Sequence, residues 1–207
     1  MGVIKNIRVE LIILGAVFIN VLISYNIDIG FYDYFAKFGG GPGLIYLKEF
    51  FRDITKLGDS LWYFLTFFVL FFLTLLINKT FFNIEKYRTY FKYFSLTGLV
   101  YLSATGILTQ FLKHIIGRAR PNYTSFDGGF KFDFFTTSSN FHSFPSGHAS
   151  TIFIICLLAG ILIPRLKYFF YLFAGLVAIS RVVVGAHFTT DIIAGALVAL
   201  IVFKILN

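Results

Sequence analysis

The sequence has little charge and almost no cysteine. Of its 207 residues 14% are charged and 57% are hydrophobic, and the mean hydropathy is +0.80. A chain this apolar is not an ordinary soluble domain, and its composition indicates an integral membrane protein. Cys156 is the single cysteine, so an intrachain disulfide and a metal site built from several thiolates are both excluded.

The sequence also lacks internal repeats, low-complexity linkers and the alternating short segments of a transmembrane β-barrel. We therefore predict an all-α polytopic membrane protein, with residues 1–207 forming one domain. No small-x-small cleavage site follows the first apolar run, so we count that run as a span. Six transmembrane helices in one bundle are expected, joined by short interfacial helices, at residues 11–25, 61–77, 94–116, 149–163, 168–184 and 192–206.

The net charge of +8 comes from basic residues that flank the apolar runs instead of forming one long stripe. This placement is typical of membrane-edge anchors and of ligands for an anion, so we predict the lipid bilayer as a partner and no nucleic acid. Residues 39–43 are rich in glycine and predict a flexible break. After it, Lys48, Arg52 and Lys56 recur every four residues, which predicts a short helix along the membrane surface.

Polar residues gather where the expected spans end. Lys113 and Arg120 end the third span, His148 begins the fourth, Arg181 lies near the end of the fifth, and His187 begins the sixth. Because successive spans alternate in direction, all of these ends emerge on the same side of the membrane. We therefore expect the five side chains to converge on one face.

Two short motifs indicate what such a face could do. Residues 145–148, Pro-Ser-Gly-His, predict a tight turn into a helix, and the unpaired N–H groups of a helix start suit an anion such as phosphate. His187 and Asp191 are four residues apart, so on one helix face the carboxylate would orient the imidazole as a nucleophile. Each motif alone also fits a structural role, as a capped helix start or a buried hydrogen bond.

Taken together, the segments Lys113-x6-Arg120-Pro121, Pro145-Ser146-Gly147-His148 and Ser180-Arg181-x5-His187-x3-Asp191 are more specific. Their order and internal spacings resemble the three-part signature of the type 2 phosphatidic acid phosphatase (PAP2) superfamily, in its bacterial lipid-phosphatase branch. The signature covers more than a third of the chain, and the six-span layout extends the resemblance over nearly all of it.

The resemblance implies a phosphatase that uses neither a metal nor a cofactor. His187 would form a phosphohistidine, Asp191 would orient it, and His148 would protonate the leaving oxygen and then activate water. The resemblance also implies six residues that hold the phosphate oxygens, namely Lys113, Arg120, Ser146, Gly147, Ser180 and Arg181. Three nearby residues lie outside the signature and are interpreted as taking no part, although His142 could contact a headgroup: His114, Arg118 and His142.

The implied substrate is a lipid phosphate, which could be undecaprenyl pyrophosphate, phosphatidylglycerol phosphate, phosphatidic acid or a lipid A phosphate. The alternative is a non-catalytic membrane transporter or lipid-binding scaffold of the same fold. Once the cations of the phosphate site are set aside, the loop charges favour a cytoplasmic N-terminus. We therefore expect a bacterial inner (plasma) membrane protein whose active face is in the periplasm or outside.

Overall fold

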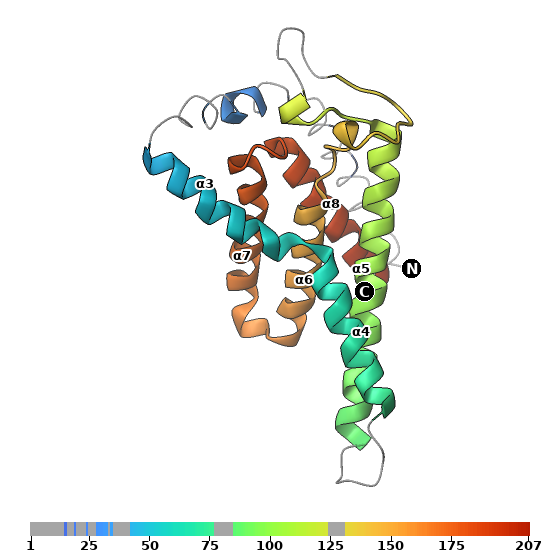
Figure 1. The fold of residues 1–207 in the computed structure, drawn as a ribbon. Helices are drawn as coiled ribbons and strands as arrows, with labels where there is room; N and C mark the ends of the chain where they lie inside the picture. The colour runs from blue at the N-terminus through green and yellow to red at the C-terminus, as the bar shows by residue number, and fades with distance from the viewer. Residues whose placement is uncertain are drawn as a thin grey trace.

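A computed structural model describes residues 15, 19, 24, 28–32, 34, 42–76, 85–123 and 131–207 of the chain. Within these residues the structure is helical, with one isolated bridge between Arg118 and Phe132 (Figure 1). The all-α prediction is confirmed for this part of the chain. The α-helices are α3 (Pro42–Ile54), α4 (Ser60–Leu76), α5 (Glu85–Ile116), α6 (Gly147–Leu162), α7 (Lys167–Val183) and α8 (Thr189–Leu206).

Four described segments are long and apolar enough to cross a membrane, and α6 is a shorter apolar helix. The chain is accordingly an integral membrane protein, while the count of six spans stays a prediction. Most of the first expected span, residues 11–25, lies outside the described residues. The four segments are Ile45–Leu76, Glu85–Ile116, Pro164–Val183 and Thr189–Leu206.

The expected spans agree with α4, α6, α7 and α8 to within three residues at each end. The largest error is at α5, which begins nine residues before the expected residue 94, in the stretch between two expected spans. That stretch is basic and rich in tyrosine, so its mean hydropathy is too low for a predicted span. It nevertheless forms the start of a helix that continues directly into the apolar part. With a rise of about 1.5 Å per residue, the 32 residues of α5 extend for about 48 Å.

The segment before α4 differs from its prediction. Residues 39–41 are outside the described part, but Pro42 and Gly43 form the first turn of α3 instead of a flexible break. Proline is favoured at the first helical position because its missing N–H is not needed there. Lys48 and Arg52 do lie on this helix, whereas Lys56 belongs to the 3-10 turn Thr55–Gly58 that follows it.

α6 packs against α5, α7 and α8 and so forms the centre of the bundle. Small residues allow these helices to approach closely. A Cβ placed on Gly195 of α8 would lie 2.5 Å from the Ser146 carbonyl oxygen and 2.9 Å from the Ala149 Cβ of α6. α4 packs on α5 in the same way, since a Cβ on Gly98 would lie 2.4 Å from the Phe67 ring. Glycine contacts of this kind are typical of helix packing in membranes, and they fix the relative positions of the helix ends.

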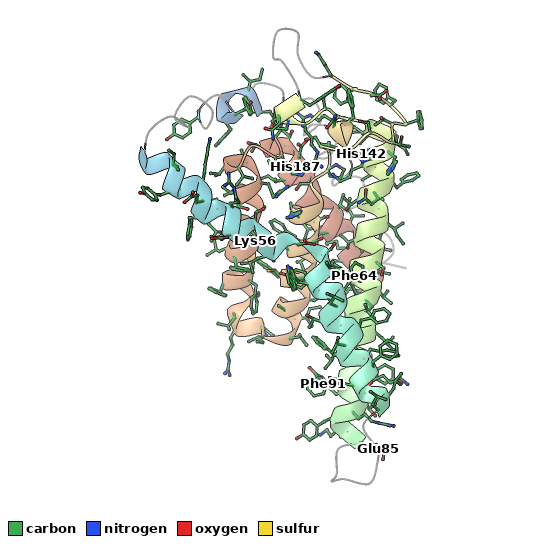
Figure 2. All side chains as sticks on the ribbon, in the orientation of Figure 1. Lys56, Phe64, Glu85, Phe91, His142 and His187 are labelled. Carbon is green, nitrogen blue, oxygen red and sulfur yellow. The ribbon has the colours of Figure 1, made fainter. Side chains whose placement is uncertain are left out.

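The two ends of the bundle differ. We call the end that carries the last turn of α5, the first of α6, the last of α7 and the first of α8 the loop end, because residues 131–146 and 184–188 cover it. At the opposite end, α4 and the first half of α5 extend beyond α6 and α7 as a hairpin (Figure 1), which we call the hairpin end. Figure 2 shows His187 and His142 at the loop end, and Glu85 and Phe91 at the hairpin end.

Candidate active site

A cavity of about 280 Å³ lies at the loop end, between α4, α5, α6, α7 and the residues just before α8. Its walls come from chain segments more than 120 residues apart. The expectation that the polar span ends converge is therefore confirmed. Six of the nine predicted site residues line this cavity: Lys113, Arg120, Gly147, His148, Arg181 and His187.

Three of these residues are cations, and each is held by a neutral oxygen atom. Lys113 is 6% exposed and its Nζ donates to the His142 carbonyl oxygen at 2.6 Å. The Nε of Arg120 donates to a carbonyl oxygen of the 131–146 loop at 3.0 Å, and burial lowers the pKa of this residue. Arg181 donates from Nη1 to the Thr55 hydroxyl at 2.9 Å, and its buried Nε has no partner among the described residues. Such a cavity attracts anions and has donors left to bind them.

His187 and Asp191 lie together, but the predicted reason is wrong. α8 begins only at Thr189, so His187 precedes the helix and does not share a helical face with Asp191. The helix start brings them together instead, because Asp191 in the first turn accepts a hydrogen bond from the Phe188 N–H at 2.8 Å. His187 Nδ1 lies 3.5 Å from Asp191 Oδ2.

The state of the His187 ring follows from its burial. His187 is 3% exposed, and burial lowers its pKa below the usual range although Asp191 acts in the opposite direction. The imidazole is therefore neutral near pH 7. Its Nδ1 has no hydrogen-bond partner among the described residues and faces the carboxylate, which leaves Nε2 for a ligand in the cavity. Hydrogen bonds of catalytic groups are commonly long before a substrate binds, and 3.5 Å fits that pattern.

His148 is the second residue of α6 and reaches the cavity beside α4. The chain before α4 packs tightly on it, since a Cβ on Gly58 would lie 2.9 Å from the His148 Cβ and 3.1 Å from its Cδ2. Asp59 and Ser60 follow Gly58 and also line the cavity. Sequence reasoning missed these three residues because they belong to no motif, although an Asp-Ser pair before an apolar run is typical of a helix start.

Ser146 and Ser180 do not line the cavity, and both are fully buried. The Ser146 N–H donates to the Asp191 carbonyl oxygen at 2.9 Å, and its side chain caps α6. The Ser180 hydroxyl donates to the Val177 carbonyl oxygen at 2.6 Å. The Ser146 N–H and the Ser180 hydroxyl are thus bonded within the protein, and the role of these two serines as phosphate ligands stays a prediction.

Arg118 was interpreted as taking no part, but the structure places it in direct contact with the predicted site. It is 1% exposed, and its Nη1 donates to Asp191 Oδ1 at 2.7 Å. His142 also contributes, through the carbonyl oxygen that holds Lys113, while its ring Nε2 donates to a loop carbonyl oxygen at 3.1 Å. His114 is exposed and does not line the cavity. One clue to Arg118 was available, since it lies between Lys113 and Arg120, at one of the six positions that the first signature segment leaves open.

Comparison with known proteins identifies the family. The model of the PAP2 superfamily matches residues 94–207, which is more than half of the chain. The lipid A 1-phosphatase of Rhizobium johnstonii is 35% identical over 164 residues, and that of Rhizobium etli is 35% identical over 153 residues. These alignments cover 77% and 72% of this chain, and the chain spans 66% and 65% of the length of these relatives.

Two crystal structures share the fold. One is a PAP2-type phosphatidylglycerolphosphate phosphatase from Bacillus subtilis, with a TM-score of 0.60 and 24% identity over 94% of this chain and 92% of that one. The other is LpxE of Aquifex aeolicus, with a TM-score of 0.56 and 21% identity over 86% and 93%. The helical arrangement, the converging signature residues and the family match agree, and the chain belongs to the PAP2 superfamily.

Proposed function

We propose that this protein is a membrane phosphatase that removes a phosphate from a phosphomonoester or pyrophosphate of a lipid through a phosphohistidine on His187. One observation carries the proposal: two histidines and three cations from separate helix ends line a single cavity beside a buried carboxylate. A nucleophile, a proton donor and a set of phosphate ligands are what phosphoryl transfer requires.

The reaction follows from the positions of the two histidines. His187 Nε2 attacks phosphorus, and the bond to the lipid oxygen breaks as His148 donates a proton to that oxygen. Water then attacks the phosphohistidine while His148 accepts its proton, and inorganic phosphate leaves. Asp191 stabilises the positive charge that His187 carries in between. The non-bridging oxygens are held by Lys113, Arg120, Arg181 and the N–H of Gly147.

The proposal includes no metal ion and no cofactor. The cavity wall carries three cations, which already supply the positive charge that a metal would bring to a phosphoryl group. Among the described residues, no three His, Cys, Asp or Glu side chains gather as a metal site. We therefore assign the stabilisation of phosphate charge to the protein's own side chains.

The substrate is proposed to be a lipid phosphate that stays in the bilayer. Lipid A phosphate is the first candidate, because two relatives at 35% identity are named lipid A 1-phosphatases. Undecaprenyl pyrophosphate, phosphatidylglycerol phosphate and phosphatidic acid are the others. Phe64, Leu102 and Gly106 extend the cavity wall away from the cations with apolar surface, which suits the part of a lipid next to its phosphate.

We further propose how the chain lies in the membrane. Residues 1–207 form one domain with six spans, namely residues 11–25, α4, α5, α6, α7 and α8, and α3 lies near the membrane surface. The loop end faces the periplasm or the outside of a bacterial inner membrane. The cations that remain after those of the cavity are set aside support this orientation, since they favour the N-terminal and hairpin side as cytoplasmic.

Phosphate release by the purified protein tests this function. Each of the four lipids is presented in mixed micelles with excess EDTA, and the products are followed by thin-layer analysis. We expect release from at least one lipid, and loss of release in His187→Ala. His114→Ala is the matched control and should retain activity, because His114 is exposed and away from the cavity.

Two results would contradict the proposal. The first is that none of the four lipids loses phosphate although a thermal unfolding measurement shows that the protein is folded. In that case the chain is a scaffold or transporter of this family. If phosphate release requires an added divalent metal after lipid dispersal is controlled, the assignment of charge stabilisation to the three cations is wrong.

A further inference from the structure

Asp191 belongs to a network of buried ion pairs that extends away from the cavity. Arg118 donates from Nη1 to Asp191 Oδ1 and from Nη2 to Asp28 Oδ2, each at 2.7 Å. The Arg118, Asp28 and Asp191 side chains are at most 1% exposed. None of the three lines the cavity, so none of them is in place to touch a substrate.

Thr190 hydrogen-bonds to both Arg118 and Asp28, so that the three side chains form a ring. Its hydroxyl accepts a hydrogen bond from Arg118 Nη1 at 2.7 Å and donates a short hydrogen bond to Asp28 Oδ2. Its N–H donates to Asp28 Oδ1 at 2.8 Å. Asp28 therefore caps the first turn of α8, the turn that also carries Asp191, and it does so from a part of the sequence more than 160 residues away.

The other oxygen of Asp191 is fixed as well. Oδ2 accepts from the Ser143 hydroxyl at 2.5 Å and from the Phe188 N–H at 2.8 Å. The carboxylate is thus held at both oxygens, and the Arg118 guanidinium lies 4.4 Å from the centre of the Phe188 ring. A carboxylate held in this way can turn neither toward the cations of the cavity nor away from His187.

From this ring we infer that Asp28 and Arg118 are positioning residues for the nucleophile. They fix the rotamer of Asp191, and Asp191 in turn fixes the orientation of His187. The inference rests on the proposed function, because it concerns the same phosphohistidine. It adds that a residue on the N-terminal side of α3 controls the rate of phosphoryl transfer without touching the phosphate.

The cost of burying these charges supports a positional role. Desolvation of a buried ion pair cancels much or all of its attraction, so stability alone does not account for such a group. A guanidinium presents two pairs of donors in one plane, and here it uses them to set the distance between two carboxylates. Phosphoryl transfer to a histidine is sensitive to such positions, since a shift of about 1 Å in a catalytic group can slow a reaction about 10²-fold.

Two variants test the inference, and they disturb the buried ring to different extents. Asp28→Asn keeps the shape of the side chain and removes its charge, and Thr190→Val removes one hydroxyl from the ring. We expect each to slow phosphohistidine formation by up to about 100-fold in single-turnover experiments. Inhibition by inorganic phosphate should change less than twofold, because the cavity ligands are untouched. Asp53→Asn is the matched control, since Asp53 also pairs with a cation at 2.7 Å but its side chain is 77% exposed.

The outcomes separate this inference from the proposed function. If wild-type protein forms no phosphohistidine, the proposed function fails whatever the variants do. If wild type is active and both variants form phosphohistidine at the wild-type rate, the positioning role is wrong. A loss of rate that matches the loss of folded protein in both variants, or that comes with weaker phosphate inhibition, would make the ring purely structural and also overturn the inference.

Discussion

The loop end and the hairpin end are built from the same helices, yet they bury opposite kinds of groups. At the loop end, Lys113, Arg118 and Asp191 are all less than 9% exposed and are held by hydrogen bonds. At the hairpin end, α4, α5 and α6 enclose an apolar groove of about 340 Å³ beside Phe67 and Gly98. Under the proposed function, we expect the loop end to carry the chemistry and the hairpin end to contribute mainly to the packing of the helices.

This difference predicts that changes at the two ends have separable effects. Substitutions at the loop end should lower the rate of phosphate release more than the stability of the fold. Substitutions at the hairpin end should do the reverse. Each prediction below tests one side of this separation, and the expected effects decrease in order.

The largest effect is expected from Asp191→Asn at the loop end. The amide keeps the shape and one acceptor oxygen but cannot stabilise a charged His187. Turnover should fall by about 10²- to 10⁴-fold, while inhibition by inorganic phosphate stays nearly unchanged. Steady-state rates in mixed micelles provide the measurement, and near wild-type turnover in a folded variant would remove Asp191 from the mechanism.

Arg120→Lys and Arg181→Lys should come next. Both keep the charge but replace a planar fork by a single ammonium, so donors aimed at the phosphate oxygens are lost. A decrease in kcat/KM of about 10²-fold is expected for each. Arg165→Lys is the control, because Arg165 is exposed in the turn between α6 and α7. Full activity in both cavity variants would show that these arginines serve only as anchors.

The smallest effect is expected at the hairpin end, from Gly98→Ala. The new methyl group would lie 2.4 Å from the Phe67 ring and force α4 and α5 apart, which should destabilise the fold by about 1–3 kcal/mol. Gly175→Ala on α7 has nothing within 4 Å and should be neutral or stabilising by up to about 1 kcal/mol. Thermal unfolding in detergent measures both.

The same variants test whether the hairpin end is separate from the chemistry. The folded fraction of Gly98→Ala should release phosphate at the wild-type rate per molecule. A rate that falls by more than tenfold while the protein remains folded would show that the two ends are coupled, and the separation drawn above would be lost.

Periodicity and motif spacing predicted much of this molecule. Apolar runs located five of the helices, and alternation of span direction predicted that Lys113, His148 and His187 lie on one face, where the structure shows a cavity. Both patterns are local along the chain, which is why a sequence reveals them. The start of α5 was missed because its first two turns are polar and carry no apolar period.

The ring around Arg118 could not be predicted in the same way. Its partner Asp28 is 90 residues away in sequence, and the other contacts to Asp191 come from a loop without any regular pattern. The positions of Ser146 and Ser180 outside the cavity wall could not be predicted for a related reason. A motif states which residues are present, but it does not state whether their donors are already bonded inside the protein.

The central claim is that His187, and not His148, carries the phosphoryl group. Protein is mixed with a phosphorus-32 lipid phosphate, quenched, digested under alkaline conditions, and the acid-labile label is mapped to a peptide. We predict that label is found on the peptide with His187, is absent in His187→Ala, and accumulates in His148→Ala with a substrate that has a good leaving group. Label on the His148 peptide, or label that persists in His187→Ala, would contradict the account.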